Sequence, residues 1–197
     1  MQIDAIFEQN KKNDVKTDLS KFDNSWYRVG AGTFRRVAWY FTNALLFKNP
    51  LNPISCSKVL LLRMFGAKVG KNVVIKPSVN IKYPWKLSIG YNSWIGEEVW
   101  IDNLDEVTIG DNCCLSQGAL LLCGSHEHKS VAFDLKIKPI ILEEGVWIGA
   151  RSIVLQGVTC KSHSILSANS VASTNLDVYS IYRGNPAHNV SHRVISY

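Results

Sequence analysis

The sequence predicts an all-β fold in which short extended repeats stack on one another. Three regularities within residues 69–171 lead to this prediction. An aliphatic residue recurs every six positions from Val69 onward, and glycine recurs at the second position of the repeat. The fifth position is small or β-branched at Val73, Val79, Ser93, Val99, Cys113, Ala119, Ser125, Ser152, Val158, Ser164 and Ser170. A period of six does not match the apolar stripe of a helix, and so short a repeat must stack on its neighbours to bury its apolar atoms.

The repeat keeps one frame over most of its length. It reads VGKNVV, IKPSVN, IGYNSW, IGEEVW, IGDNCC, LSQGAL and LLCGSH, and it resumes with LEEGVW, IGARSI, VLQGVT, CKSHSI and LSANSV. Two longer units, IKYPWKLS and IDNLDEVT, interrupt it. Side chains alternate between the faces of an extended chain, so positions one, three and five can all face inward only where the chain stays extended. Glycine at position two suits a backbone that turns or passes close to another segment, at Gly70, Gly90, Gly96, Gly110 and Gly149.

The chain divides into three parts. Residues 1–68 are expected to form an N-terminal tail and a helical cap, residues 69–182 the repeat region, and residues 183–197 a C-terminal tail. A loop at 126–139, HEHKSVAFDLKIKP, is expected to protrude from the repeat region. Residues 1–24 are polar, and we expect them to be loosely ordered.

Two helices are expected in the N-terminal part. One spans TFRRVAWYFTNALLF at 33–47, with Thr33 as its N-cap, and the other spans SCSKVLLLRMFG at 55–66, capped by Ser55 and ended by Gly66. The pair could cover the open first repeat, whose edge would otherwise be exposed. Alternatively, the apolar helix with its Arg and Trp residues could dock on a membrane surface.

The composition limits the classes of partner. The net charge is +6, but the basic residues are scattered, with runs of two at Lys11–Lys12 and Arg35–Arg36. Nucleic-acid binding calls for a clustered basic stripe, so the sequence argues against a nucleic-acid partner. The mild positive charge favours anionic partners such as phosphates, acidic glycans or a membrane surface.

The cysteines and the start of the chain indicate a cytoplasmic protein. Five cysteines, without a CxxC pair, argue against disulfides and a zinc knuckle and favour a reducing compartment. The start MQIDAIFEQNKKND lacks the pattern of a signal peptide, and the apolar segment 37–47 is too short to cross a bilayer. Their places in the repeat put Cys113, Cys123 and Cys160 in the core.

Longer motifs resemble a known family. The stretch YPWKLSIGYNSWIGEEVWIDNLDEVTIGDN is followed by CGSHEH, by KPIILEEGVWIGARSIVLQGVT and by RGNPA. This order resembles the hexapeptide-repeat O-acetyltransferases, in the colanic-acid or exopolysaccharide-biosynthesis branch of the maltose/galactoside acetyltransferase group. The resemblance implies a left-handed parallel β-helix with triangular coils, and acetyl-CoA as co-substrate with no metal. It further implies a homotrimer with sites between subunits and a sugar or glycan acceptor, free or lipid-linked, in the cytoplasm or at the inner face of the membrane.

The resemblance makes His126 the catalytic base, because the family's base is the histidine that follows the GS corner. An alcohol that attacks a thioester must lose its proton. An imidazole, with a reference pKa of about 6.5, can accept that proton near neutral pH. From the residues alone, an exposed loop histidine is the alternative interpretation of His126.

His128 forms an HxH pair with His126, and such a pair on an extended segment can ligate a metal. The third ligand would have to be His163, which lies at an outward position far along the repeat. We therefore expect no metal site, and we assign His128 to the acceptor side or to the surface.

The remaining site residues each have a structural alternative. The residues assigned to the acceptor are Asp102, Asn103, Trp147 and His128, and those assigned to coenzyme A are Gly149, Ala150, Ser167, Ala168, Arg183, Asn185 and Pro186. Asp and Asn also favour bulges, so Asp102 and Asn103 suit a turn one coil below His126. Trp147 also suits packing on a neighbouring subunit, and RGNPA also suits a turn that ends the β-helix.

Three functions compete at this point. The first is an acetyl-CoA-dependent O-acetyltransferase that acts on a sugar hydroxyl of a surface polysaccharide or its precursor. The second is a related antibiotic-type O-acetyltransferase, which shares the histidine and the VWIG segment. The third is a metal-binding or purely structural hexapeptide-repeat protein.

Overall fold

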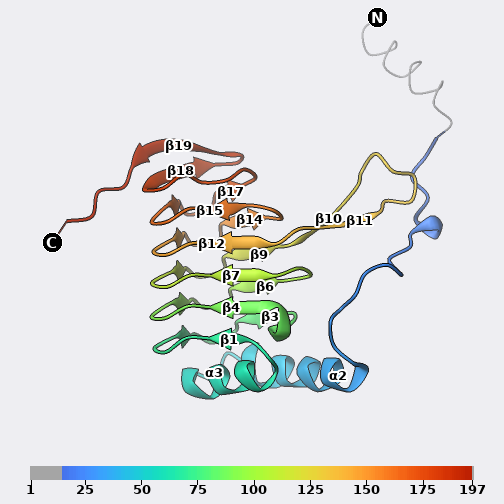
Figure 1. The fold of residues 1–197 in the computed structure, drawn as a ribbon, viewed down its shortest axis with the longest axis horizontal. Coiled ribbons are helices and arrows are strands. Elements are labelled where there is room, and N and C mark those ends of the chain that lie inside the picture. The colour runs from blue at the N-terminus through green and yellow to red at the C-terminus, as the bar shows by residue number, and fades with distance from the viewer. Residues whose placement is uncertain (1–14, 197) are drawn as a thin grey trace, which may run out of the picture. The chain divides into compact units, whose positions relative to one another are not determined.

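A computed structural model describes residues 15–196, which form two compact units (Figure 1). The β-helix unit contains residues 29–124 and residues from 137 onward. The second unit, called the arm here, contains residues 15–28 and 125–136. The chain enters the arm directly after Gly124 and returns at Ile137.

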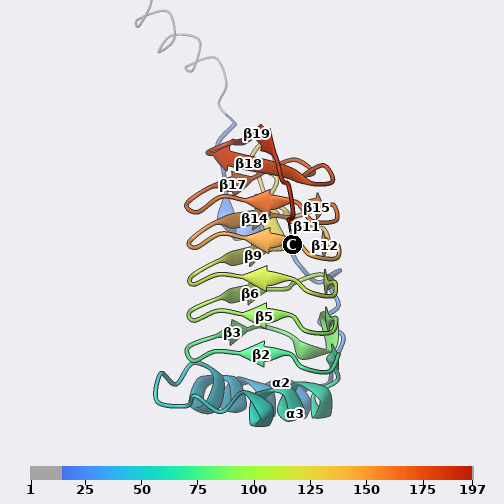
Figure 2. The same cartoon turned by 90° about the vertical axis from the view of Figure 1, so that its left-hand side faces the viewer.

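The β-helix unit is a stack of coils whose strands form three parallel sheets, named A, B and C here (Figure 2). Sheet A contains β1 (Lys68–Val69), β4 (Leu87–Ile89), β7 (Val107–Ile109), β12 (Ile140–Leu142) and β15 (Thr159–Cys160). Sheet B contains β2 (Val74–Ile75), β5 (Trp94–Ile95), β8 (Cys114–Leu115), β13 (Trp147–Ile148), β16 (Ile165–Leu166), β18 (Ser180–Gly184) and the antiparallel β19 (Ala187–His192). Sheet C contains β3 (Asn80–Ile81), β6 (Trp100–Asp102), β9 (Leu120–Leu122), β14 (Ile153–Leu155) and β17 (Val171–Ala172).

The first and fifth positions of the repeat build the core. The third position is mostly outside it, as at the exposed Lys71, Tyr91 and Glu144, because the backbone turns at the third and fourth positions and does not stay extended. First-position residues pair in register from coil to coil, so that Ile75 lies beside Ile95 and Ile95 beside Leu115, and all three are fully buried. Small fifth-position residues such as Ala119 and Ser152 are fully buried as well. The predicted all-β parallel solenoid is therefore confirmed, and its interior is a continuous ladder of aliphatic side chains.

Two positions of the repeat are set by the backbone. A Cβ at Gly90 would lie 2.6 Å from the carbonyl carbon of Gly110 in the next coil, so the second-position glycine permits close stacking. The second position that the backbone sets is the fourth one, which the repeat pattern did not indicate. It takes a left-handed conformation at Asn72, Ser78, Asn92, Glu98, Asn112, Gly118, Gly145, Arg151, Gly157, His163 and Asn169. The asparagines and glycines at this position tolerate positive φ, which explains why they recur there.

The helical cap covers the first coil, as predicted (Figure 1). It consists of α2 (Thr33–Thr42), its continuation η2 (Asn43–Phe47) and α3 (Ser55–Met64). Trp39 donates its indole N–H to the carbonyl of Ile81 at 2.9 Å, and the buried Lys58 ammonium donates to the carbonyl of Lys76 at 2.9 Å. The cap thereby satisfies backbone groups at the open end of the stack.

The predicted helix caps need correction. The N-cap positions are Gly32 and Ile54, and neither makes a side-chain capping bond, so Thr33 and Ser55 are the first residues of their helices. The Ser55 hydroxyl instead accepts the backbone N–H of Ile75 at 2.8 Å, which ties α3 to the first coil. The predicted stop, Gly66, does follow the end of α3, with a φ of +95°.

Both predicted tails also need correction where they are described. Residues 15–24 contain the short helix η1 (Leu19–Lys21), and Asp18 donates its N–H to the carbonyl of Val131 within the arm at 2.8 Å. Only residues 1–14 of the expected loose segment lie outside the described part. At the other end, β19 pairs with β18 and covers the last edge of sheet B. Among residues 15–196, no helix is long and apolar enough to cross a membrane.

Candidate active site

His126 lies in the arm, at the end of β10 (Gly124–His126), which pairs with β11 (Leu135–Ile137). Its ring is partly buried, and its Nδ1 lies 2.8 Å from the carbonyl oxygen of Phe133. A carbonyl oxygen can only accept a hydrogen bond, so Nδ1 carries the proton. In the neutral ring, the lone pair is then on Nε2, which is the form that a general base requires.

Phe133 holds His126 in two ways. Besides accepting the hydrogen bond, it stacks its ring on the imidazole, with centroids 4.3 Å apart and planes 9° apart. The backbone of Phe133 has a φ of +54°, an uncommon conformation for an aromatic residue. The turn that imposes it is braced by a hydrogen bond of 2.6 Å from the Ser130 hydroxyl to the Asp134 carboxylate. Backbone conformations of this kind persist where the surrounding structure overdetermines them.

The arm contains two further contacts around this pair. Phe22, from the N-terminal segment, lies with its ring centroid 5.7 Å from that of His126. Lys136 on β11 pairs with Glu127 at 2.9 Å, and this contact is the main reason why the pKa of Glu127 is lowered. Sequence reasoning missed Phe22, because nothing in a polar N-terminal segment signals contact with a histidine about a hundred residues later.

The other predicted arm residue is His128, whose side chain is exposed. His163, its suggested partner in a metal site, belongs to the β-helix unit. There it stacks on Tyr179, with centroids 4.7 Å apart, beside Gly145. Within residues 15–196, no three His, Cys, Asp or Glu side chains are grouped as a metal ion would require.

Asp102 and Asn103 follow one another at the end of β6, and they behave differently. Asp102 is 8% exposed and pairs with Lys82 of the preceding coil, with Nζ and Oδ1 2.8 Å apart. Asn103 is fully buried, and its amide accepts the N–H of Tyr83 at 2.9 Å and donates to the Tyr83 carbonyl at 2.6 Å. The Asn103 amide is therefore committed to holding the longer unit IKYPWKLS of the neighbouring coil.

The prediction that Asp102 lies one coil below His126 was wrong by four residues. In sheet C, Asp102 pairs with Leu122 rather than with His126. The chain has already passed from Gly124 into the arm by the time it reaches His126. The difference arises because a coil that contains a longer unit spans twenty residues, as the Asp102–Leu122 register shows.

A groove of about 690 Å³ opens between the helical cap and the first coils of the β-helix unit. It is lined by Thr33, Arg36, Val37, Trp39, Tyr40, Phe41, Asn43, Ala44, Lys48, Asn80, Ile81, Lys82, Tyr83, Trp85, Trp100 and Asp102. Aromatic rings, three cations and one carboxylate thus face one volume. Flat aromatic faces and charged donors are features that suit a sugar with an anionic group. The groove gathers Asp102 with residues that the sequence analysis left unassigned.

Most of the residues predicted for coenzyme A come together in one row along the β-helix unit, namely Gly149, Ala150, Ser167, Ala168 and Arg183. Ile148 pairs with Leu166 and Leu166 pairs with Tyr182, so the residues that follow these strands stand one above another. Gly149 donates its N–H to the Leu166 carbonyl at 2.7 Å, and Ser167 donates to the Tyr182 carbonyl at 2.8 Å.

Within this row, the small residues have distinct surroundings. A Cβ at Gly149 would lie 2.4 Å from the backbone nitrogen of Ala168, so the next coil already occupies the space beside this glycine. Ala150 is partly exposed and Ala168 is exposed, so these alanines are the open part of the row. Arg183 is exposed in the coil above them.

The segment RGNPA forms the turn between β18 and β19. Gly184 pairs with Ala187 across the turn and has a φ of +105°, and Asn185 and Pro186 are exposed at its tip. The segment RGNPA therefore forms a turn at the end of the β-helix, which was its structural alternative. The predicted contact of Arg183, Asn185 and Pro186 with coenzyme A stays a prediction.

Trp147 projects from β13 and is 45% exposed. Its indole N–H donates to the hydroxyl of Ser116 in the preceding coil at 2.9 Å, which fixes the ring. In sheet B its neighbours across the coils are Cys114 and Ile165. An ordered, half-exposed tryptophan beside the row described above is well placed for contact with a ligand or a subunit.

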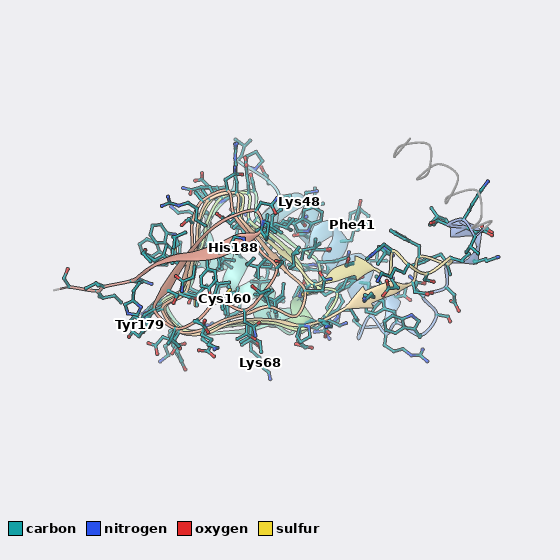
Figure 3. All side chains as sticks on the ribbon, turned by 90° about the horizontal axis from the view of Figure 1, so that it is seen from above. Phe41, Lys48, Lys68, Cys160, Tyr179 and His188 are labelled. Atoms are coloured by element: carbon teal, nitrogen blue, oxygen red, sulfur yellow. The ribbon has the colours of Figure 1, made fainter. Side chains whose placement is uncertain are left out.

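The buried cysteines offer no nucleophile. Burial raises the pKa of Cys113 to about 11 and that of Cys123 to about 12. Cys160, labelled in Figure 3, is fully buried, and its pKa is raised for the same reason. A thiol must ionise to attack, so these three side chains serve as core residues, as their places in the repeat predict.

Comparison with known proteins identifies the family. Residues 139–172 match the family described as hexapeptide repeat of succinyl-transferase. WcaF of Escherichia coli, named as a colanic acid biosynthesis acetyltransferase, is 37% identical over 177 residues, which are 90% of this chain and 97% of WcaF. The chain belongs to the hexapeptide-repeat acetyltransferases.

Solved structures agree with the fold of this hexapeptide-repeat acetyltransferase. A hexapeptide-repeat acetyltransferase of Vibrio cholerae, in complex with acetyl coenzyme A, superposes with a TM-score of 0.73 at 22% identity. The match covers 83% of this chain and 91% of the other. A galactoside acetyltransferase in complex with coenzyme A gives a TM-score of 0.71 at 24% identity, over 81% and 80% of the two chains.

Proposed function

We propose that this acetyltransferase moves the acetyl group of acetyl-CoA to a sugar hydroxyl of a surface polysaccharide or its precursor, with His126 as general base. The hydrogen bond from Nδ1 to the Phe133 carbonyl is the observation that carries the proposal, because it leaves Nε2 as the proton acceptor. The sugar acceptor is supported by relatives named for colanic acid biosynthesis and for galactoside O-acetylation. The donor is supported by complexes of structural relatives with acetyl-CoA and CoA.

The proton moves in one cycle. Nε2 of neutral His126 takes the hydroxyl proton as the sugar oxygen attacks the carbonyl carbon of the thioester. The tetrahedral intermediate then expels the CoA thiolate, which recovers the proton from the imidazolium as it leaves. The products are an acetyl ester and CoA with a free thiol. The carbonyl of Phe133 accepts from Nδ1 throughout and stabilises the imidazolium while it exists.

In this proposal the two substrates use different parts of the β-helix unit. CoA lies along the row of Ala150, Ser167 and Ala168, with its phosphates toward Arg183. The acceptor sugar enters the groove, where the Asp102 carboxylate accepts a sugar hydroxyl and the Trp100 ring packs on the sugar face. Asn103 holds the backbone of Tyr83 on one side of the groove and does not contact the sugar. We further propose the homotrimer of the family and a cytoplasmic location.

Thiol release from acetyl-CoA, measured with a panel of sugars and nucleotide sugars, tests the proposal. Acceptor-dependent release in the wild type should fall by at least about a hundredfold in His126→Ala, in line with the usual contribution of a general base. His188→Ala, which removes an exposed histidine on β19, is the matched control and should keep full activity. Calorimetric binding of CoA to both variants checks that the donor site is intact.

The possible outcomes separate the functions. Release that survives His126→Ala would mean that another residue is the base. Acetylation of aminoglycosides or other antibiotics, in place of sugars, would assign the protein to the antibiotic-type enzymes. Failure of the wild type to bind CoA would reject the acetyl-CoA-dependent activity altogether.

A further inference from the structure

The charge of this protein is segregated, although the basic residues look scattered in the sequence. Residues 24–96 contain no Asp and no Glu, whereas the chain has 16 acidic residues in all. The same segment carries Arg28, Arg35, Arg36, Lys48, Lys58, Arg63, Lys68, Lys71, Lys76, Lys82 and Lys86, which are half of the 22 basic residues. Apart from residues 24–28, which include Arg28 and belong to the arm, this segment lies in the β-helix unit and contains the helical cap and the first coil. That end of the unit therefore has an excess of basic residues, although Lys58 is buried and Lys82 pairs with Asp102.

The same end exposes large apolar side chains. On α2 and η2 these are Phe34, Val37, Phe41 and Leu45, which follow one another at intervals of three or four residues and therefore share one face of the helix. Phe34 is 88% exposed, and Leu51, in the connection to α3, is 87% exposed. The other exposed apolar residues of the cap are Tyr40, Leu46, Ile54, Leu60 and Met64.

Most of these side chains lie outside the groove. Val37, Tyr40 and Phe41 also line it, whereas Phe34, Leu45, Leu46, Leu51, Ile54, Leu60 and Met64 do not. The cap buries Trp39, Phe47 and Leu62 against the first coil, so its other faces carry the exposed residues. No further coil lies beyond the two helices in Figure 1 and Figure 2, and Figure 3 labels Phe41 and Lys48 on this element. We call the exposed residues of 33–64 the cap surface. An apolar surface of this kind marks a site of association.

We propose that the cap surface docks on an anionic lipid bilayer. Its aromatic and aliphatic side chains would enter the boundary between headgroups and acyl chains, and the exposed Arg36, Lys48 and Arg63 would meet the lipid phosphates. Arg36 and Lys48 reach this surface from the edge of the groove. A second copy of the chain is a poorer occupant, because two cap surfaces in contact would bring cations against cations with no acidic residue in either segment. The lipid surface supplies both the apolar layer and the negative charge that this end lacks.

Vesicle flotation of the full chain tests the proposal. We expect binding to phosphatidylcholine vesicles that contain about 30 mol% phosphatidylglycerol, little binding to pure phosphatidylcholine, and weakening at about 0.5 M salt. The double variant Phe34→Glu with Leu51→Glu should reduce the partition coefficient by at least about tenfold. Neither residue lines the groove.

The matched control places the same change at the other end of the β-helix unit. Val190→Glu with Val194→Glu alters two side chains that are 51% and 83% exposed and should leave vesicle binding unchanged. Circular dichroism melting of both variants checks the fold. Equal binding to neutral vesicles, or unchanged binding of the Phe34 and Leu51 variant, would overturn the proposal. The proposal would also be overturned if the wild type did not bind vesicles and if its mass in solution were larger than that of the Phe34 and Leu51 variant. The cap surface would then join copies of the chain.

Discussion

The imidazole of His126 lies parallel to the ring of Phe133, and its Nδ1 lies 2.8 Å from the carbonyl oxygen of the same residue. One residue thus fixes both the ring plane and the tautomer of the proposed base. The main chain provides the hydrogen bond and the side chain provides the stack. Substitution of the side chain can therefore separate the two effects.

Replacing Phe133 by Asn should slow the reaction without abolishing it. Asn tolerates the positive φ, so the carbonyl should stay in place while the stack is lost. An aromatic pair is worth about 0.5–1.5 kcal/mol, which corresponds to roughly a two- to thirteenfold fall in kcat. Steady-state kinetics should show this fall with the KM for acetyl-CoA unchanged.

Phe133→Tyr is the control for this change, because it retains a ring and should restore most of the activity. Nitrogen NMR of the His126 side chain gives an independent readout, since Nδ1 should remain the protonated nitrogen in all three proteins. An unchanged kcat in Phe133→Asn would show that the stack does not position the base.

Replacing Asn103 by Ala should destabilise the fold. The change removes both hydrogen bonds to Tyr83 and leaves the partly buried N–H of Tyr83 without a partner, whereas the Tyr83 carbonyl still accepts the N–H of Lys86 at 3.0 Å. An unpaired N–H costs about 1–3 kcal/mol and the second lost hydrogen bond about 1 kcal/mol, so urea denaturation should show a loss of about 2–4 kcal/mol. Asn189→Ala, at an exposed position on β19, should change the free energy of unfolding by less than about 0.5 kcal/mol.

This experiment also distinguishes the two interpretations of Asn103. A variant with normal stability and a raised KM for the acceptor would assign Asn103 to sugar binding and would contradict the positioning role. The corresponding change at Asp102, Asp102→Asn, is expected to raise the KM for the acceptor, because its carboxylate lines the groove.

Replacing Gly90 by Ala should destabilise the stack through overpacking. The added methyl group would meet the Asp111 carboxylate and the backbone of Gly110 and Asp111, and that backbone cannot move without disturbing the next coil. We expect a loss of about 1–3 kcal/mol in the free energy of unfolding, seen as a lower melting temperature. Gly32→Ala is the control, because a Cβ there has no neighbour within 4 Å. Equal melting temperatures for the two variants would contradict the explanation of the second-position glycine.

The repeat could be recognised in the sequence because its physics is local. Each coil meets only its neighbours, so the same requirement for an inward aliphatic and an inward small residue returns every six positions. The fourth position shows the limit of this reasoning. It is filled by Asn, Gly, Ser, Glu, Arg or His, and what these residues share is a backbone conformation rather than a side-chain property.

The arm and the groove depended on contacts between distant segments. Nothing in HEHKSVAFD indicates that the carbonyl of Phe133 returns to His126, or that Phe22 packs on the same ring. The pairing of Asp102 with Leu122 likewise depended on the length of the coil that contains the longer unit. For the same reason the sequence could name Asn103 but could not decide between turn and ligand.

The sequence by itself determined the stacked repeat, its inward residues at the first and fifth positions, the two helices at its start and the histidine that follows the GS corner. These features follow from the period of the apolar residues and from short motifs, which are properties of neighbouring residues. Only the tertiary structure decided which nitrogen of His126 is protonated, which of Asp102 and Asn103 is committed to the backbone, and that the helical cap presents a basic and apolar surface. Those properties depend on burial and on hydrogen bonds between residues far apart in the chain, and only folding brings such residues together.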